Sequence, residues 1–148
     1  MAGIHETLLI EIMKVGRLYE KKMTPIFKQY GLTLIQYNIL RILNGAFPSS
    51  LNPGEIKSRI LYENSDLTRL IDRLVDKNMV SRGVSEENRR KINIQITDKG
   101  RTILDQIMAK MVKVSGDFYA GTLPEDQVIQ ITQKLELLES QLTKSDQY

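Results

Sequence analysis

The feature that most constrains the fold is a change of hydrophobic period in the middle of the chain. Over residues 92–97 isoleucines alternate with polar residues, and this period of two predicts a strand with one buried face. The segment Met79–Val84 predicts its partner strand, and the polar segment Ser85–Lys91 between them is the expected hairpin tip. On both sides of this hairpin apolar residues recur at steps of three and four, which predicts helices. We therefore expect a mainly α fold with a small β-hairpin.

Four helices are predicted before the hairpin. The first covers Ile4–Tyr30, with an interruption expected near Pro25, and Gly31 ends it. The second opens at a capping box, in which the side chains of Thr33 and Gln36 each accept a hydrogen bond from the other residue's backbone N–H.

The third and fourth helices are short. Asn52 caps the third helix, which is expected to end near Leu61. The fourth is expected to start at Asn64 or Ser65 and to reach Lys77–Asn78.

Two further helices are predicted after the hairpin. The helical period returns at Lys99, and Gly116 and Gly121 flank an expected break. The segment Thr122–Glu125 then opens the last helix.

The order of these elements predicts a winged helix-turn-helix. Two short helices joined by the turn Tyr62–Asn64 precede a two-stranded hairpin, and in such a unit the second helix enters the major groove of DNA. The fourth helix is amphipathic, as this role requires. Its apolar side carries Leu67, Leu70, Ile71, Leu74 and Val75, and its polar side carries Ser65, Arg69, Asp72, Arg73 and Asp76.

Both charged parts of this unit have two interpretations. Ser65 and Arg69 fall in the first two turns of the fourth helix, from which a recognition helix reaches base edges. The same face also fits a solvated surface on which Arg69 and Arg73 pair with the aspartates three residues further on. At the hairpin tip the cations Arg89–Lys91 suit the minor groove, but the two glutamates before them could balance them in a solubilising loop.

Charge and composition limit the classes of function that we expect for this chain. Residues 57–101 hold 11 basic and 7 acidic residues, so the excess of positive charge lies in the predicted DNA-binding part. With no cysteine and a single histidine, His5, the chain offers no zinc ligand set and no nucleophile with a base. We expect neither a cofactor nor enzymatic activity. No apolar run is long enough to span a membrane, and the start lacks the features of a secretory signal, so we expect a cytoplasmic protein.

Four segments carry a family pattern in order: Leu32–Leu40, Leu67–Val80, Arg82 through Asn88–Lys91, and Ile94–Gly100. Through these four segments the chain resembles the MarR (multiple antibiotic resistance regulator) family of bacterial transcription regulators. The resemblance implies a single domain over residues 1–148. Within it, a winged helix-turn-helix of residues 32–100 is flanked by N- and C-terminal dimerisation helices in residues 1–31 and 101–148.

The resemblance also implies partners and site residues. It implies a homodimer that binds a palindromic operator in double-stranded DNA, in many members as a repressor that a small phenolic or aromatic ligand releases. The expected DNA contacts are Asn64, Ser65, Thr68, Arg69, Arg73, Arg89, Arg90 and Lys91. Met13, Tyr19 and Tyr37 are candidates for the ligand pocket, although residues of these types at helical spacing more often belong to the core. A winged helix that binds another protein is the alternative function.

Three features depart from the usual family pattern. Asn88 stands where the wing motif usually has an aspartate that braces the wing arginine. Asn78 replaces the glycine that commonly ends the recognition helix, and asparagine tolerates the left-handed conformation expected there. The absence of cysteine excludes the branch of the family that senses peroxides through a thiol.

Overall fold

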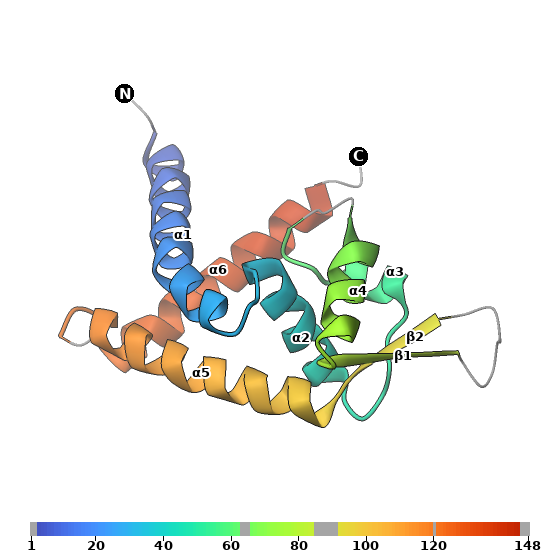
Figure 1. Cartoon of the computed structure of the whole chain (residues 1–148). Coiled ribbons are helices and arrows are strands. Elements are labelled where there is room, and N and C mark those ends of the chain that lie inside the picture. Colours follow the sequence, from blue (N-terminus) through green and yellow to red (C-terminus); the bar gives the residue numbers. More distant parts are fainter. Residues whose placement is uncertain (1–2, 63–65, 85–91, 120, 146–148) are drawn as a thin grey trace. The chain divides into compact units, whose positions relative to one another are not determined.

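The computed structural model describes residues 3–62, 66–84, 92–119 and 121–145. Over these residues the order of elements is the predicted one, mainly helical with a single β-hairpin (Figure 1). The elements are α1 (Ile4–Gln29), α2 (Leu34–Ala46), α3 (Pro53–Lys57), α4 (Leu67–Asp76), β1 (Val80–Val84), β2 (Ile92–Ile96), α5 (Asp98–Tyr119) and α6 (Glu125–Ser145).

The chain divides into two compact units, residues 1–111 and residues 112–148, and α5 contributes to both. The core of the first unit joins the second half of α1 to the other elements up to the start of α5. Its largest fully buried side chains are Met23, Phe27, Ile39, Leu40, Leu43, Ile56, Ile71, Leu74, Ile94, Leu104 and Ile107. The rings of Phe27 and Tyr37 stack with their centroids 4.7 Å apart, which contributes about 0.5–1.5 kcal/mol beyond the burial of their area.

Helix α1 is continuous through Pro25, so the predicted interruption is wrong. Proline removes one intrahelical hydrogen bond. However, Met23, Ile26 and Phe27 are all buried around it, and their packing stabilises the helix on both sides of the missing bond. The helix ends as predicted, because Gly31 adopts the left-handed conformation with φ 65°.

The predicted caps of α2 and α3 are confirmed, but α3 is shorter than expected. Thr33 and Gln36 form the capping box of α2, and Asn52 and Glu55 form that of α3. Helix α3 ends at Lys57, not near Leu61, because a tertiary contact draws the chain away: the backbone N–H of Leu61 donates to Oδ1 of Asn38 on α2 at 2.9 Å.

Helix α4 starts later than predicted and ends where predicted. The helix begins at Leu67 after Asp66, later than the predicted start at Asn64 or Ser65, and those two residues lie outside the described part of the chain. The end is as predicted. Asn78 has φ 56°, so it supplies the left-handed turn that a glycine usually supplies there.

The hairpin is antiparallel, with Val80 opposite Ile96 and Arg82 opposite Ile94. Residues that face each other across an antiparallel pair project on the same side of the sheet. Ile94 and Ile96 are buried, so this side faces the core. Leu51 extends the sheet, since its backbone N–H donates to the carbonyl of Ile94 at 2.9 Å and its carbonyl accepts from the N–H of Ile94 at 2.8 Å. The tip, residues 85–91, lies outside the described residues.

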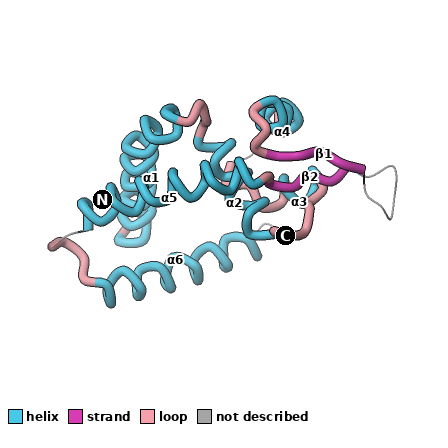
Figure 2. The backbone as a smooth tube through the Cα atoms, turned by 60° about the horizontal axis from the view of Figure 1, so that its bottom comes forward, coloured by secondary structure: helices cyan, strands magenta, loops and turns pink. Residues whose placement is uncertain are grey.

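In the second unit, α5 passes Gly116 and ends at Tyr119, between the two glycines that were predicted to flank a break. Only Gly121 of the two glycines adopts a positive φ, at 76°, and the chain turns there before α6. Figure 2 shows both helices as long rods joined by this turn.

Candidate nucleic-acid interface

Helix α4 has one buried face and one exposed face. Leu67, Ile71 and Leu74 are buried, and the helix packs against α2, α3 and β1. Thr68, Arg69 and Arg73 are exposed on the opposite side. This is the arrangement predicted for a recognition helix, with polar side chains available to a partner and apolar ones fixed in the core. Asn64 and Ser65, which were predicted to extend this face, lie outside the described residues.

The ion pairs on this face differ from the predicted ones. Asp72 does not pair with Arg69 on its own helix. Its Oδ1 accepts a hydrogen bond from Nη2 of Arg82 on β1 at 2.7 Å. Arg69 instead lies 3.5 Å from a carboxylate oxygen of Asp66.

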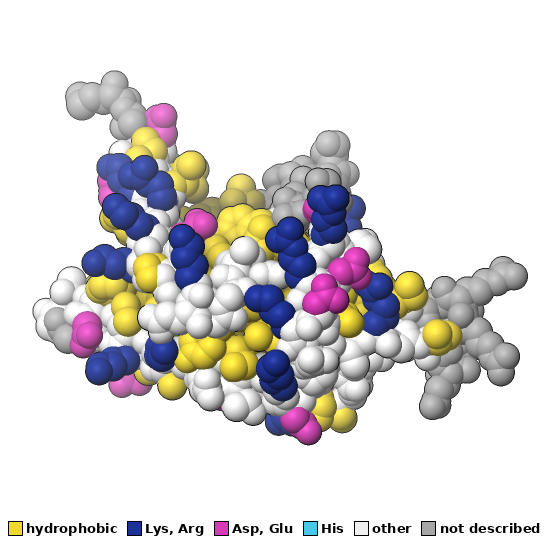
Figure 3. Space-filling view, in the orientation of Figure 1, with side chains coloured by type: hydrophobic (Ala, Val, Ile, Leu, Met, Phe, Trp, Pro, Cys, Tyr) yellow, Lys and Arg dark blue, Asp and Glu magenta, His cyan; other side chains and the backbone are white. Residues whose placement is uncertain are grey.

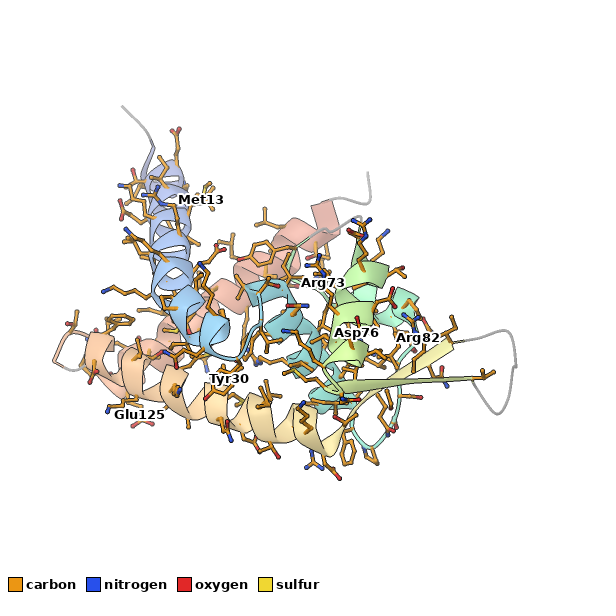
Figure 4. All side chains as sticks on the ribbon, in the orientation of Figure 1. Met13, Tyr30, Arg73, Asp76, Arg82 and Glu125 are labelled. Atoms are coloured by element: carbon orange, nitrogen blue, oxygen red, sulfur yellow. The ribbon has the colours of Figure 1, made fainter. Side chains whose placement is uncertain are left out.

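Arg73 and Asp76 were also predicted to pair with each other. Among the described residues no ion pair joins them, and Arg73 donates no side-chain hydrogen bond to any described residue. Figure 4 labels both residues on α4 and Arg82 on the adjacent strand β1. The side chain of Arg73 is exposed, so solvent or a ligand can reach its guanidinium.

Three side chains fix the C-terminal end of α4. Lys77 Nζ donates to the carbonyl of Gly31 in the turn between α1 and α2. Lys99 Nζ, at the start of α5, donates to the carbonyl of Lys77 at 2.8 Å, and Thr97 Oγ1 donates to the carbonyl of Asn78 at 2.7 Å. Lys99 thus places a cation at the carbonyl end of α4, and Lys77 places one at the carbonyl end of α1, where each opposes the negative end of a helix dipole. Sequence reasoning did not single out Lys77 or Lys99, although lysine near a helix end was an available signal.

The predicted wing contacts fall on the tip of the hairpin. Arg89, Arg90 and Lys91, together with Asn88, lie outside the described residues. The strands that lead to them are described, and Val84 and Ile92 at their outer ends are paired and exposed. Figure 3 shows Lys and Arg side chains, with some Asp and Glu among them, on the surface over α4 and β1.

A cavity of about 400 Å³ opens in the first unit between α1 and α2. Its lining is mainly apolar, with charged groups from α1: Glu20, Thr24, Phe27, Lys28, Leu32, Thr33, Leu34, Ile35 and Tyr62. None of the three predicted ligand residues lines it.

The three predicted ligand residues differ in exposure. Met13 is 74% exposed on α1 (Figure 4), and Tyr19 is 37% exposed. Tyr37 is buried and stacked on Phe27. Burial raises the pKa of Tyr37 above its ordinary value of 10.0, although the neighbouring Arg41 guanidinium opposes part of this rise. Tyr37 is thus a core residue, and its stacking partner Phe27 lines the cavity.

The described part of the chain holds neither a metal-ligand cluster nor a membrane-spanning helix. Residues 3–62, 66–84, 92–119 and 121–145 contain no group of three or more His, Cys, Asp or Glu side chains that could hold a metal ion. Within the same ranges no helix combines the length and the apolar character of a membrane span.

Comparison with known proteins identifies the family of the chain. The sequence model of the family described as transcriptional regulator SarA/Rot matches residues 21–107, more than half of the chain. The chain belongs to this family. The HTH-type transcriptional regulator PecS of Dickeya dadantii is 28% identical over 117 residues, which are 78% of this chain and 70% of PecS. The HTH-type transcriptional regulator MgrA of Staphylococcus aureus is also 28% identical, over 122 residues, 82% of this chain and 78% of MgrA.

Solved structures confirm the winged helix-turn-helix fold. A MarR-family regulator from Rhodococcus superposes with a TM-score of 0.80 at 20% identity, covering 93% of this chain and 96% of that chain. A mutant MarR from E. coli in complex with operator DNA has a TM-score of 0.75 at 22% identity, covering 89% of this chain and 93% of the MarR chain. The organohalide-sensing regulator RdhR in its 2,4-dichlorophenol-bound form has a TM-score of 0.80 at 16% identity, covering 95% of this chain and 82% of the RdhR chain.

These findings confirm the resemblance to the MarR family. The chain is a DNA-binding transcriptional regulator of the MarR/SarA type with terminal helices, and its relatives are regulators rather than enzymes.

Proposed function

We propose that this regulator is a homodimeric repressor that binds a pseudo-palindromic operator, with α4 in the major groove and the hairpin wing in the minor groove. The observation that carries the proposal is the exposed polar face of α4, where Thr68, Arg69 and Arg73 project from a helix whose other face is buried. The operator complex of the MarR structure, which is similar in fold, supports it. Each subunit is a single domain over residues 1–148, with residues 32–100 reading DNA in the cytoplasm.

Arg69 is the residue proposed to read a base. Its side chain is 76% exposed in the first turn of α4, and its ion pair with Asp66 is long, at 3.5 Å. An exposed pair of this kind contributes about 0–1 kcal/mol, so a base edge can compete for the guanidinium. Arg73, one turn further on, contacts a base or a phosphate. The remaining proposed contacts are Asn64, Ser65 and Thr68 before and on α4, and Arg89, Arg90 and Lys91 at the wing tip.

The terminal helices are proposed to form the dimer interface. Helix α1 exposes a large share of its apolar side chains, and α6 exposes several of its own. The exposed apolar residues of the two helices are Ile4, Leu8, Leu9, Ile10, Met13, Val15, Leu18, Ile129, Ile131, Leu135, Leu137 and Leu142. Exposed apolar surface on this scale marks an interaction site. The charges are complementary, because α1 carries five basic and three acidic residues and α6 carries two basic and four acidic ones.

A small aromatic or phenolic effector is proposed to release the DNA. The cavity beside Phe27 has the volume and the mainly apolar lining of a small-molecule site. The dichlorophenol bound to RdhR, which is similar in fold, supports a phenol as the class of ligand. The three predicted ligand residues lie outside this lining: Tyr37 stacks on Phe27 in the core, and Met13 and Tyr19 are exposed on α1.

Operator selection tests the DNA-binding part of the proposal. DNA fragments selected from a random pool should contain a pseudo-palindrome with half-sites about 10 base pairs apart, and their affinity should fall steeply with salt. Arg69→Ala should relax the preference at one base position in each half-site by about 1–3 kcal/mol. Arg101→Ala on α5 serves as the control, since it removes an arginine that lies off α4. An unchanged consensus with Arg69→Ala would reject the base contact.

Sedimentation tests the dimer. At micromolar concentration the protein should sediment at about twice the 17.0 kDa mass of the chain. Introducing a charge into the exposed stripe of α1, as in Leu18→Glu, should shift it toward the monomer and weaken operator binding. A wild-type protein that remains a monomer while binding the full operator tightly would contradict the proposed assembly.

A further inference from the structure

The ion pair between Asp72 and Arg82 joins the two parts of the molecule proposed to read DNA. Asp72 lies on α4 beside the exposed arginines, and Arg82 lies on β1, the strand that leads to the wing. The two residues are ten positions apart in the chain, and Nη2 of Arg82 approaches Oδ1 of Asp72 to 2.7 Å. This is a short, charge-assisted hydrogen bond.

The register of the hairpin explains why Arg82 reaches α4. Arg82 stands opposite Ile94, and the next pair on the same side is Val80 with Ile96. Val80, Ile94 and Ile96 are all buried, so this is the side of the hairpin that faces the core. Strand alternation would place an apolar residue at position 82. The arginine there points toward α4, and the carboxylate of Asp72 receives it.

We propose that Arg82 is a positioning residue for operator recognition, which occupies the carboxylate of Asp72 so that Arg69 remains available for DNA. This inference rests on the proposed function. Asp72 stands three residues after Arg69, at a spacing that favours an ion pair on the helix surface. The bond from Arg82 takes the carboxylate away from that pairing, and the same bond fixes the base of the wing against the recognition helix.

Stability alone does not account for this arrangement. The side chains of Arg82 and Asp72 are 36% and 47% exposed, and ion pairs this accessible contribute little to folding. The larger consequence is for binding. If Arg82 is removed, the carboxylate of Asp72 is free to attract Arg69 and to repel the DNA phosphates.

The test compares three variants on one operator selected with the wild-type protein: Arg82→Met, the double variant Arg82→Met/Asp72→Asn, and Arg101→Met. The last breaks another exposed arginine–aspartate pair, with Asp98 at 3.9 Å on α5, and also removes the guanidinium that lies 4.2 Å from the centre of the Phe47 ring. The measured quantity is discrimination, the ratio of dissociation constants for this operator and for one altered at the base that Arg69 reads. Salt dependence and thermal unfolding are recorded for each.

Arg82→Met should reduce discrimination at least about fivefold, the lower end of what one base contact supplies. The double variant should recover it to within about twofold of wild type, because the competing carboxylate is gone. Arg101→Met should match wild type. A loss of discrimination that the double variant does not recover, together with a salt dependence of the affinity that is smaller by about one phosphate contact, would show that Arg82 binds DNA itself. This result would overturn the proposal.

Two further outcomes would also overturn it. Discrimination unchanged in Arg82→Met would show that Asp72 does not compete for Arg69. A lowered unfolding temperature with normal discrimination would make the pair purely structural. If Arg82→Met does not fold, Asp72→Asn is measured alone: it removes the competing carboxylate, so discrimination like that of the wild type is expected and a loss would overturn the proposal. Failure of the proposed function is distinguishable, because then the wild-type protein would select no operator.

Discussion

Gly100 provides a sharp test of how the hairpin and α5 are joined. It lies buried in the first turn of α5. A Cβ atom at this position would approach the carbonyl oxygen of Met79 to 2.1 Å and Cγ1 of Ile96 to 2.9 Å, whereas ordinary contacts begin at 3.4 Å. The carbonyl of Met79 would have to move by about 1.3 Å, and it is backbone rather than the end of a flexible side chain.

The cost of Gly100→Ala follows from these contacts. Overpacking a core typically costs about 1–3 kcal/mol. The carbonyl of Met79 also accepts the N–H of Thr97 at 3.1 Å, and loss of that bond adds about 0.5–1.5 kcal/mol. The better helix propensity of alanine returns about 0.5–1 kcal/mol. We expect a net destabilisation of about 2–3 kcal/mol, which for a chain of this size lowers the unfolding temperature by about 4–12 °C.

Thermal unfolding at one fixed protein concentration measures this effect, because the stability of a dimer depends on concentration. Gly45→Ala is the matched control, since Gly45 is exposed in α2 and a Cβ there meets nothing within 4 Å. It should stabilise the protein by about 0.4–1 kcal/mol. A Gly100→Ala variant as stable as wild type would refute the close approach of α5 to Met79.

Three further outcomes are expected. Burial raises the pKa of Tyr37, so the unfolded state loses the phenol proton first, and stability should fall as pH rises from about 10 toward the pKa of the folded state. In urea titrations between about pH 9 and 11, the stability of Tyr37→Phe should fall less than that of the wild type. An equal fall would exclude Tyr37 as its source. Asn78→Ala should destabilise the protein by about 1–2 kcal/mol at φ 56° whereas Asn78→Gly should not, and equal effects would contradict the left-handed turn. Arg90→Ala should weaken DNA binding across many sequences, most at sites with a narrow A·T-rich minor groove, and wild-type affinity in gel-shift titrations would mean that the wing does not touch DNA.

Features determined within a few residues of chain could be predicted from the sequence. The capping box of Thr33 and Gln36 spans three residues, and the left-handed turn at Asn78 depends on that residue's own backbone preference. The buried face of α4 follows from helical spacing, and the exposed arginines follow from the same spacing. These local rules were enough for the order of elements and for the candidate recognition helix.

Features that depend on contacts between distant segments could not be predicted in this way. The end of α3 is set by a hydrogen bond to Asn38, 23 residues before Leu61. The anchor from Lys77 to Gly31 spans 46 residues. Asp72 was assigned to the nearest arginine at a favourable spacing, but the tertiary fold brings Arg82 closer. In each case the partner is chosen by how elements pack, which residue spacing does not encode.

The charges of the proposed DNA-binding part indicate a division of roles between α4 and the wing. Within α4 the two arginines are matched by two aspartates, so the helix as a whole has no net charge. Residues 57–101 carry an excess of four positive charges, and the hairpin tip 85–91 contributes one of these, because Glu86 and Glu87 offset two of its three cations. Because affinity for the phosphate backbone scales with the cations that contact it, we expect the three adjacent cations of the wing tip to supply more of the attraction than α4 does. A neutral recognition helix contributes little to non-specific binding. Its contribution is discrimination, and this depends on which partner each aspartate has. The bond from Arg82 to Asp72 therefore bears on selectivity more than on affinity.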